Sequence, residues 1–221
     1  MAKRIYLSPS EQPNNMYAYG NTNEKAVCRE ISAYAEKALK RNGFEVINAT
    51  LTNMSARCSE ADKWGADLYI PIHTNAYNGK VSGTRVFCYR LSGEGYKASQ
   101  AIYNVLAPMT PGKSENITAN PSLYEVKMPN APTVYIEVDF HDVPDIAKWL
   151  IEHTEEIGEA ICKGICNHYG VTYKAAVTET KTETKGKMYR VQVGYYSKLE
   201  NATAMKNKLK AAGFDAIIKE E

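Results

Sequence analysis

Hydrophobic and polar residues alternate along the first three-quarters of the chain in a pattern that predicts strands and helices in turn. Short runs rich in β-branched and aromatic residues predict buried strands at residues 4–7, 45–48, 67–72, 84–89 and 133–138. Apolar residues at helical spacing fill most of the intervals between these runs. Because strands that alternate with helices are typical of a parallel sheet covered on both faces, the predicted fold class is α/β, with a twisted, mostly parallel sheet covered by helices.

The first and last helices of this region have the clearest signals. The first has an apolar face, Thr22 or Asn23 to cap its start, and Gly43 to end it. The last is predicted as one helix from about Pro144 to Tyr169, packed on the sheet through a stripe of isoleucine and leucine.

A polar segment divides the chain near residue 173. Residues 174–187 (KAAVTETKTETKGK) alternate threonine with charged residues and contain no large apolar side chain, which predicts a flexible linker. The tail predicts a strand at 189–196, a helix at 199–212 and a strand at 214–219, a single β-α-β unit. The predicted organisation is therefore a domain at 1–173 that is large enough to be an enzyme, a linker at 174–187 and a small β-α-β module at 188–221.

Composition narrows the class of protein. The 221 residues are 44% hydrophobic and 24% charged, as in ordinary globular domains. Residues 1–172 hold 17 basic and 19 acidic residues, whereas residues 173–221 hold 10 and 6. So small a basic excess, without arginine clusters, gives little support to nucleic-acid binding and leaves another anionic polymer open as a partner of the tail.

Cysteines and segment hydrophobicity indicate a soluble protein. Five cysteines at irregular spacing predict neither a disulfide framework nor a metal knuckle, so we expect reduced packing residues. The N-terminus shows no secretory signal, and no stretch approaches the roughly 18–20 apolar residues of a membrane span. We therefore expect a cytoplasmic protein without a membrane span that reaches any external target only after release.

Polar residues that follow the predicted strands are the first candidates for chemistry, because ligands of open α/β sheets bind beyond the carboxyl ends of strands. His73 ends the run LYIPI and is either a zinc ligand or a buried structural histidine. Glu137 interrupts an apolar strand, where an unpaired carboxylate is costly, so it needs either an ionic partner or a catalytic role. Glu24 lies in the first turn of the first helix, where the helix dipole favours any carboxylate.

Four stretches in this order resemble the zinc amidases of the amidase type 3 family, which cleave the bond between N-acetylmuramic acid and L-alanine in peptidoglycan. The stretches are LSPSEQ, GNTNE, ADLYIPIHTNA and APTVYIEVDFHD, with ANPSLYEV before the last. The resemblance covers most of residues 3–170. It implies that Glu24 and His73 hold Zn²⁺, that Asn75 shapes the site, and that Glu137 is the catalytic acid and base.

The first stretch departs from the family, which has a histidine ligand there. Simple alignment places Glu11 at that position, and zinc accepts a glutamate oxygen, so the predicted metal ligands are Glu11, Glu24 and His73. His141, which follows the strand of Glu137, is the second candidate for the third ligand. Gln12 is the third candidate, either as a ligand or as a residue that holds one. If they are not metal ligands, Gln12 and His141 are predicted, like Asn75, to bind substrate or to support the site.

The tail sequence YRVQVGYYSKLENATAMKNKLKAAGFDAII resembles half of a SPOR domain, a family that binds glycan strands stripped of peptides. A two-stranded unit of this size is marginal alone, so we expect it to form a homodimer with a second tail or to dock onto the catalytic domain. The competing interpretation is a dimerisation or stability element without a wall-binding role.

The predicted function is a peptidoglycan amidase used as a phage or prophage endolysin, because a host autolysin would normally carry an export signal. One alternative is a wall-binding protein with a degenerate amidase fold, against which Glu24 and Glu137 both count. A second is a zinc peptidase that cuts within the stem peptide, because the same metal and carboxylate would serve either amide.

Overall fold

The computed structural model describes residues 2–113, 116–176, 193–214 and 216–219. The chain divides into two compact units, residues 1–176 and 177–221. Among the described residues, no helix is both long and apolar enough to cross a bilayer.

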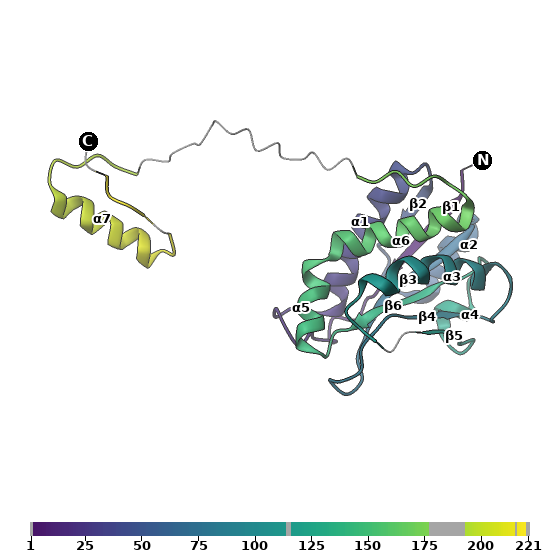
Figure 1. Ribbon diagram of the computed structural model, residues 1–221. Coiled ribbons are helices and arrows are strands. Elements are labelled where there is room, and N and C mark those ends of the chain that lie inside the picture. The colour runs from purple at the N-terminus through teal and green to yellow at the C-terminus, as the bar shows by residue number, and fades with distance from the viewer. Residues whose placement is uncertain (1, 114–115, 177–192, 215, 220–221) are drawn as a thin grey trace. The chain divides into compact units, whose positions relative to one another are not determined.

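The first unit is built on a six-stranded sheet of order β2-β1-β3-β6-β4-β5 (Figure 1). Four of its neighbouring pairs are parallel, and only β4 and β6 are antiparallel. The sheet is thus mostly parallel, as predicted. The strands are β1 (Arg4–Pro9), β2 (Glu45–Asn48), β3 (Leu68–Asn75), β4 (Arg85–Cys88), β5 (Asn116–Ala119) and β6 (Tyr135–Phe140).

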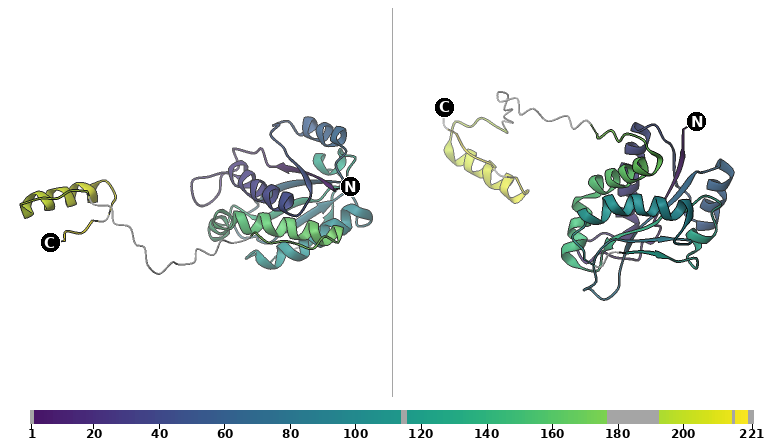
Figure 2. Two further views of the ribbon diagram at one scale, coloured as in Figure 1. Left: turned by 90° about the horizontal axis from the view of Figure 1, so that it is seen from above. Right: turned by 45° about the vertical axis from the view of Figure 1, so that its right-hand side comes forward.

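Helices cover both faces of this sheet (Figures 1 and 2). The large hydrophobic core lies between one face and three helices, α1 (Glu24–Arg41), α3 (Gly93–Leu106) and α6 (Thr154–Tyr169). A small hydrophobic cluster lies on the other face, under α2 (Met54–Trp64). The short helix α4 (Tyr124–Lys127) lies beside α2. Strand alternation divides the residues: Leu68, Ile70 and Ile72 face the large core, whereas Tyr69 lies in the small cluster. By the same alternation, the side chain of His73 lies on the face of the sheet that carries α2 and α4. All five cysteines are free and buried, as expected for packing residues.

The start of α1 follows the predicted capping pattern. Asn23 has extended backbone angles, and its side chain accepts a hydrogen bond from the backbone N–H of Ala26. This cap fixes the first turn of the helix and therefore the position of Glu24.

The predicted last helix is wrong in one respect, because it is two helices, α5 (Pro144–Glu152) and α6. His153 separates them, and its ring Nδ1 lies 2.8 Å from the carbonyl oxygen of Trp149. A continuing helix would use that carbonyl for the backbone N–H of His153, so the side chain takes the place of the backbone bond.

The structure also contains elements that the sequence did not predict. Strand β5 extends the sheet beyond β4, and the short helices η1 (Ala107–Met109) and α4 lie in segments without an apolar repeat. Strand β6 begins two residues later than predicted, because Thr133 forms only an isolated bridge to Tyr69.

The second unit confirms the predicted helix as α7 (Leu199–Ala211). The predicted strand at 189–196 lies partly outside the described residues, and its described part, 193–196, carries no strand pairing. Residues 214 and 216–219 of the other predicted strand are not assigned to a strand either, so α7 is the element that the structure describes in the tail. A strand needs a neighbour for its backbone hydrogen bonds, and one β-α-β copy supplies few.

Candidate active site

The carboxyl ends of β1, β3 and β6 lie side by side and carry the predicted site. His73 on β3 is the register partner of Glu137 on β6, so the two side chains leave the same face of the sheet. The turn after β1 is tied to this edge because the backbone N–H of Ser10 donates to the carbonyl oxygen of Ile72 over 2.9 Å. Residues from the beginning and from the end of the first unit therefore lie together at this edge of the sheet.

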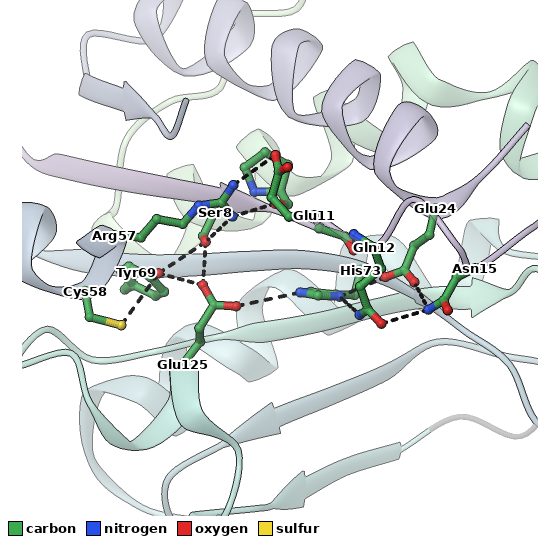
Figure 3. Close-up of polar contacts among 12 residues, drawn as sticks. Ser8, Glu11, Gln12, Asn15, Glu24, Arg57, Cys58, Tyr69, His73 and Glu125 are labelled. Carbon is green, nitrogen blue, oxygen red and sulfur yellow. Dashed lines mark hydrogen bonds and ion pairs between the residues drawn. The ribbon is translucent and has the colours of Figure 1, made fainter. Parts of the chain in front are cut away.

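Glu24 and His73 form a direct pair at this edge (Figure 3). The Oε1 atom of Glu24 lies 2.8 Å from Nδ1 of His73, and both side chains are buried. Asn15 donates to the other Glu24 oxygen over 2.7 Å and to Oε1 of Gln12 over 2.8 Å. The Nε2 atom of Gln12 in turn lies 3.4 Å from the same ring nitrogen of His73. The structure thus brings together Glu24, His73 and Gln12, with Asn15 as a partner that the sequence did not predict.

The opposite side of the His73 ring faces Glu125, a residue that sequence reasoning missed. Its Oε2 lies 3.8 Å from Nε2 of His73, and the ring stacks on Tyr135 with 4.6 Å between centroids. Burial lowers the pKa of His73, but the carboxylates of Glu125 and Glu24 outweigh it and raise the pKa to about 9. A signal for Glu125 was present, since it lies in the stretch ANPSLYEV that carried part of the family resemblance.

Among the residues that the structure describes, Glu137 forms no ion pair. Its Oε2 is buried and has no hydrogen-bond partner among the described residues. Burial raises the pKa of Glu137 to about 7; His73 and Arg85 oppose the rise and Glu24 adds to it. Arg85 is the register partner of Glu137 on β4 and lies over the Phe140 ring, 5.3 Å from its centroid. A carboxyl group with a pKa near neutrality suits proton transfer in either direction.

Glu11 lies among cations rather than with Glu24 and His73. It forms ion pairs with Lys25 over 2.8 Å, with Arg57 over 3.2 Å and with Arg29. Burial works to raise the pKa of Glu11, but the hydrogen bonds from Lys25 and Arg29 hold it below its usual value. These contacts give Glu11 a structural role and do not support the prediction that it is the third metal ligand, which stays a prediction.

His141 and Asn75 support the edge from the end of β6 and β3. The Nδ1 atom of His141 lies 2.9 Å from the hydroxyl of Thr74, and the ring stacks on Tyr17 with centroids 4.9 Å apart. Burial lowers the pKa of His141 and so favours a neutral ring. The backbone carbonyl of Asn75 accepts from the N–H of His141 over 2.8 Å, which joins the two strand ends. Both residues lie at the site, with positions already fixed by protein contacts.

The donor set at this edge fits a small cation such as zinc. An imidazole nitrogen and a carboxylate oxygen lie 2.8 Å apart, and the carboxamide of Gln12 is the next polar group beside them. Two ligands of one tetrahedral zinc ion lie about 3.3 Å apart, a similar separation. Within the described ranges, no three His, Cys, Asp or Glu side chains converge as a ready metal cluster. Gln12 is therefore the candidate for the third donor beside Glu24 and His73, through Oε1, the oxygen that accepts from Asn15.

Comparisons with known proteins show the family to which the chain belongs. Residues 10–167 match the family model described as N-acetylmuramoyl-L-alanine amidase, and residues 168–220 match the SPOR domain. A sporulation-specific N-acetylmuramoyl-L-alanine amidase of Bacillus subtilis is 24% identical over 225 residues, which span 97% of this chain and 84% of that protein.

Solved structures show the same fold. The catalytic domain of CwlV, an N-acetylmuramoyl-L-alanine amidase from Bacillus (Paenibacillus) polymyxa, superposes with a TM-score of 0.69 at 18% identity, over 77% of this chain and 99% of that one. The catalytic domain of the CD27L endolysin, which targets Clostridia difficile, does so with a TM-score of 0.62 at 22% identity, over 76% and 97%. The predicted α/β fold is therefore confirmed.

Proposed function

Because this chain belongs to the N-acetylmuramoyl-L-alanine amidase family, we propose that it is a zinc-dependent enzyme that hydrolyses the amide between N-acetylmuramic acid and L-alanine of peptidoglycan. The observation that carries the proposal is the position of Glu137. A carboxylate with a free buried oxygen and a pKa near 7 lies on the strand next to His73, whose ring contacts Glu24.

Glu24 and His73 would hold the metal, with Gln12 as the third protein donor. When bound, zinc polarises the scissile carbonyl and lowers the pKa of a water molecule toward neutrality. The remaining steps belong to the protein. Asn15 holds Gln12 and Glu24 in place by one hydrogen bond to each.

Glu137 would move the proton. Its free Oε2 takes the proton of the attacking water, and the same carboxyl group returns a proton to the nitrogen of L-alanine as that amine leaves. The mechanism needs a carboxyl group that is stable in both protonation states, and the pKa of about 7 satisfies that need. Arg85 favours the charged form that accepts the first proton.

Product analysis of digested cell walls tests the proposal. We expect new L-alanine amines and no new amine from later stem residues, with activity lost on chelation and restored by zinc. Glu137→Gln should abolish release, whereas Glu152→Gln, a change in an exposed side chain, should not. New amines from a later stem residue would instead identify a stem peptidase. No hydrolysis by a folded, zinc-supplied protein would favour the wall-binding alternative.

The tail is proposed to hold the enzyme on its substrate. The SPOR and amidase domains both indicate peptidoglycan binding. Residues 173–221, the linker and tail together, carry 10 of the 27 basic residues of the chain, and α7 exposes Lys208 and Lys210 in its last turn. Whether two tails pair is a separate proposal, and sedimentation of the full chain and of a chain ending at Ala176 would test it, with a dimer expected only for the first.

The biological setting is also a proposal. Release from the cytoplasm as a phage endolysin is the setting that the sequence favoured, and one structural relative carries that name. The competing setting is sporulation, since the sporulation-specific relative aligns with nearly the whole chain. Transcript levels after prophage induction and during sporulation distinguish the two.

A further inference from the structure

A buried polar network lies behind His73, on the side away from Glu24, and the mechanism above does not use it. It consists of Ser8, Arg57, Tyr69 and Glu125, which come from β1, α2, β3 and α4 and are all at most 3% exposed (Figure 3). Buried charged groups are costly, so their presence in a region that could hold apolar residues calls for a reason.

The network fixes one carboxylate. Ser8 and Tyr69 donate to Oε1 of Glu125 over 2.5 and 2.7 Å. Arg57 donates to the hydroxyl of Ser8 over 3.0 Å and to the backbone carbonyl of Pro9 over 2.6 Å, which anchors the network to the end of β1. With Oε1 held by two donors, Oε2 of Glu125 points toward His73.

His73 needs a partner at that side. Its Nε2 atom is buried and has no hydrogen bond within the described part of the chain, while stacking on Tyr135 holds the plane of the ring. Without a metal, the 2.8 Å contact with Glu24 needs a proton on Nδ1. A cation bound there would replace that proton, and the one N–H of the neutral imidazole would then lie on Nε2, toward Glu125. The separation of 3.8 Å between Nε2 and Oε2 of Glu125 is longer than a hydrogen bond, as is common in sites without their ligand.

We propose that Glu125 is a positioning residue that accepts the Nε2 proton of His73 and thereby presents Nδ1 as a metal donor on the Glu24 side. This inference rests on the proposed zinc function. Histidine ligands generally donate their second nitrogen to a carboxylate or carbonyl, which fixes the tautomer and strengthens the donor. Glu125 supplies that carboxylate, and the Ser8 network holds it in a single orientation.

The network also explains why the stretch LSPSEQ departs from the family pattern. Ser8 and Glu11 of LSPSEQ contact Arg57, Ser8 through its hydroxyl and Glu11 through an ion pair. Part of the segment that holds a ligand in the family thus serves here to orient Glu125 and, through it, His73.

The test compares Glu125→Gln with Glu60→Gln in the full chain. Glu60 is a matched control because it also accepts a tyrosine hydroxyl, that of Tyr6 over 2.6 Å, on the same face of the sheet, but has no contact with His73. We would measure zinc affinity by chelator competition and the protonated ring nitrogen of His73 by long-range ¹H–¹⁵N spectra of the zinc-loaded protein.

We expect Glu125→Gln to weaken zinc affinity by about 10–100-fold, and Glu60→Gln to leave it unchanged. In the wild type the proton should reside on Nε2, and in Glu125→Gln that signal should broaden or be lost. Ser8→Ala, which keeps the carboxylate but removes one anchor, should weaken affinity by about 3–10-fold and serves if Glu125→Gln does not fold.

Equal zinc affinity and an unchanged Nε2–H signal in folded Glu125→Gln would overturn the inference alone. Loss of one oxygen from the zinc coordination in X-ray absorption of that variant would also overturn it, because Glu125 would then be a ligand. A wild type that binds no zinc would overturn the proposed function together with this inference.

Discussion

Replacement of Glu11 by glutamine separates a structural carboxylate from a metal ligand. Glu11 was the leading sequence-based candidate for the third ligand, yet in the structure it meets Lys25, Arg29 and Arg57. Glu11→Gln removes the charge and leaves a side chain of nearly the same size. If the role is structural, stability should fall while zinc affinity stays the same.

The expected loss follows from the exposure of the three partners. Lys25 and Arg29 side chains are each 35% exposed, so each pair contributes about 0.2–1 kcal/mol. The Arg57 side chain is 2% exposed, and its Nη2 has no hydrogen-bond partner among the described residues, so loss of the nearby charge costs about 1–3 kcal/mol. The three contributions sum to about 1.4–5 kcal/mol. Because the amide oxygen of glutamine still attracts the cations, we expect a loss in the lower half of that range, about 2–3 kcal/mol. For a domain of this size, that lowers Tm by roughly 4–12 °C.

Thermal unfolding and zinc titration of the same samples distinguish a structural role of Glu11 from a role as metal ligand. Gln12→Ala is the contrasting variant: its side chain is exposed, so Tm should barely change, whereas zinc affinity should fall. The Tm difference between Glu11→Gln and wild type should also depend on pH. Because the pKa of Glu11 is below its usual value, its contribution is complete at neutral pH and is lost as the pH falls through the lowered pKa, so the two melting curves should converge in acid. An unchanged Tm with a tenfold or greater loss of zinc affinity would refute this reasoning.

Three further changes test the site and the fold. Glu137→Gln should reduce kcat by at least about 10²–10⁴-fold while zinc content and Tm stay at wild-type values; substantial residual turnover would remove Glu137 from the mechanism. Arg85→Met removes a cation that lowers the pKa of Glu137, so the acid limb of the activity–pH profile should move to higher pH, and a shift to lower pH would contradict the assignment. Gly158→Ala would place a Cβ 2.7 Å from the backbone nitrogen of Ala35 where α6 crosses α1, so unfolding should require about 1–3 kcal/mol less, as urea denaturation would show.

The sequence predicted the parts of the fold that depend on local pattern. Runs of apolar residues located five strands, and the candidate caps Thr22 and Asn23, of which Asn23 is the cap, located the start of α1. Strand β5, by contrast, is a four-residue edge strand with alternating exposed and half-buried residues, so its apolar signal is weak. The break at His153 depends on one side-chain contact with a carbonyl, which periodicity does not encode.

The same distinction applies to the site. His73 and Glu137 were candidates because one follows a strand and the other interrupts one, whereas Glu24 was predicted only through the family resemblance. The structure places all three at one edge of the sheet. Glu125 and Asn15 were missed because their roles arise from tertiary contacts: Glu125 lies 52 positions from its histidine neighbour in a four-residue helix, and Asn15 lies in a loop. Glu11 was favoured by alignment alone, and its surroundings in space could not be deduced from its neighbours in sequence.

Electrostatics give a reason to prefer Gln12 over Glu11 beside Glu24 and His73. A set of one carboxylate and two neutral donors has a net charge of −1, the same as two histidines and one glutamate. A second carboxylate would make the set −2 and weaken the pull of the cation on a bound water, which the hydrolytic step requires. A neutral carboxamide keeps the charge but is a weaker donor than imidazole. A carboxylate that accepts from Nε2 of His73 raises the basicity of the imidazole. In the proposed site, Gln12 as a neutral ligand and Glu125 as the partner of His73 would therefore compensate for the missing histidine without added negative charge at the metal.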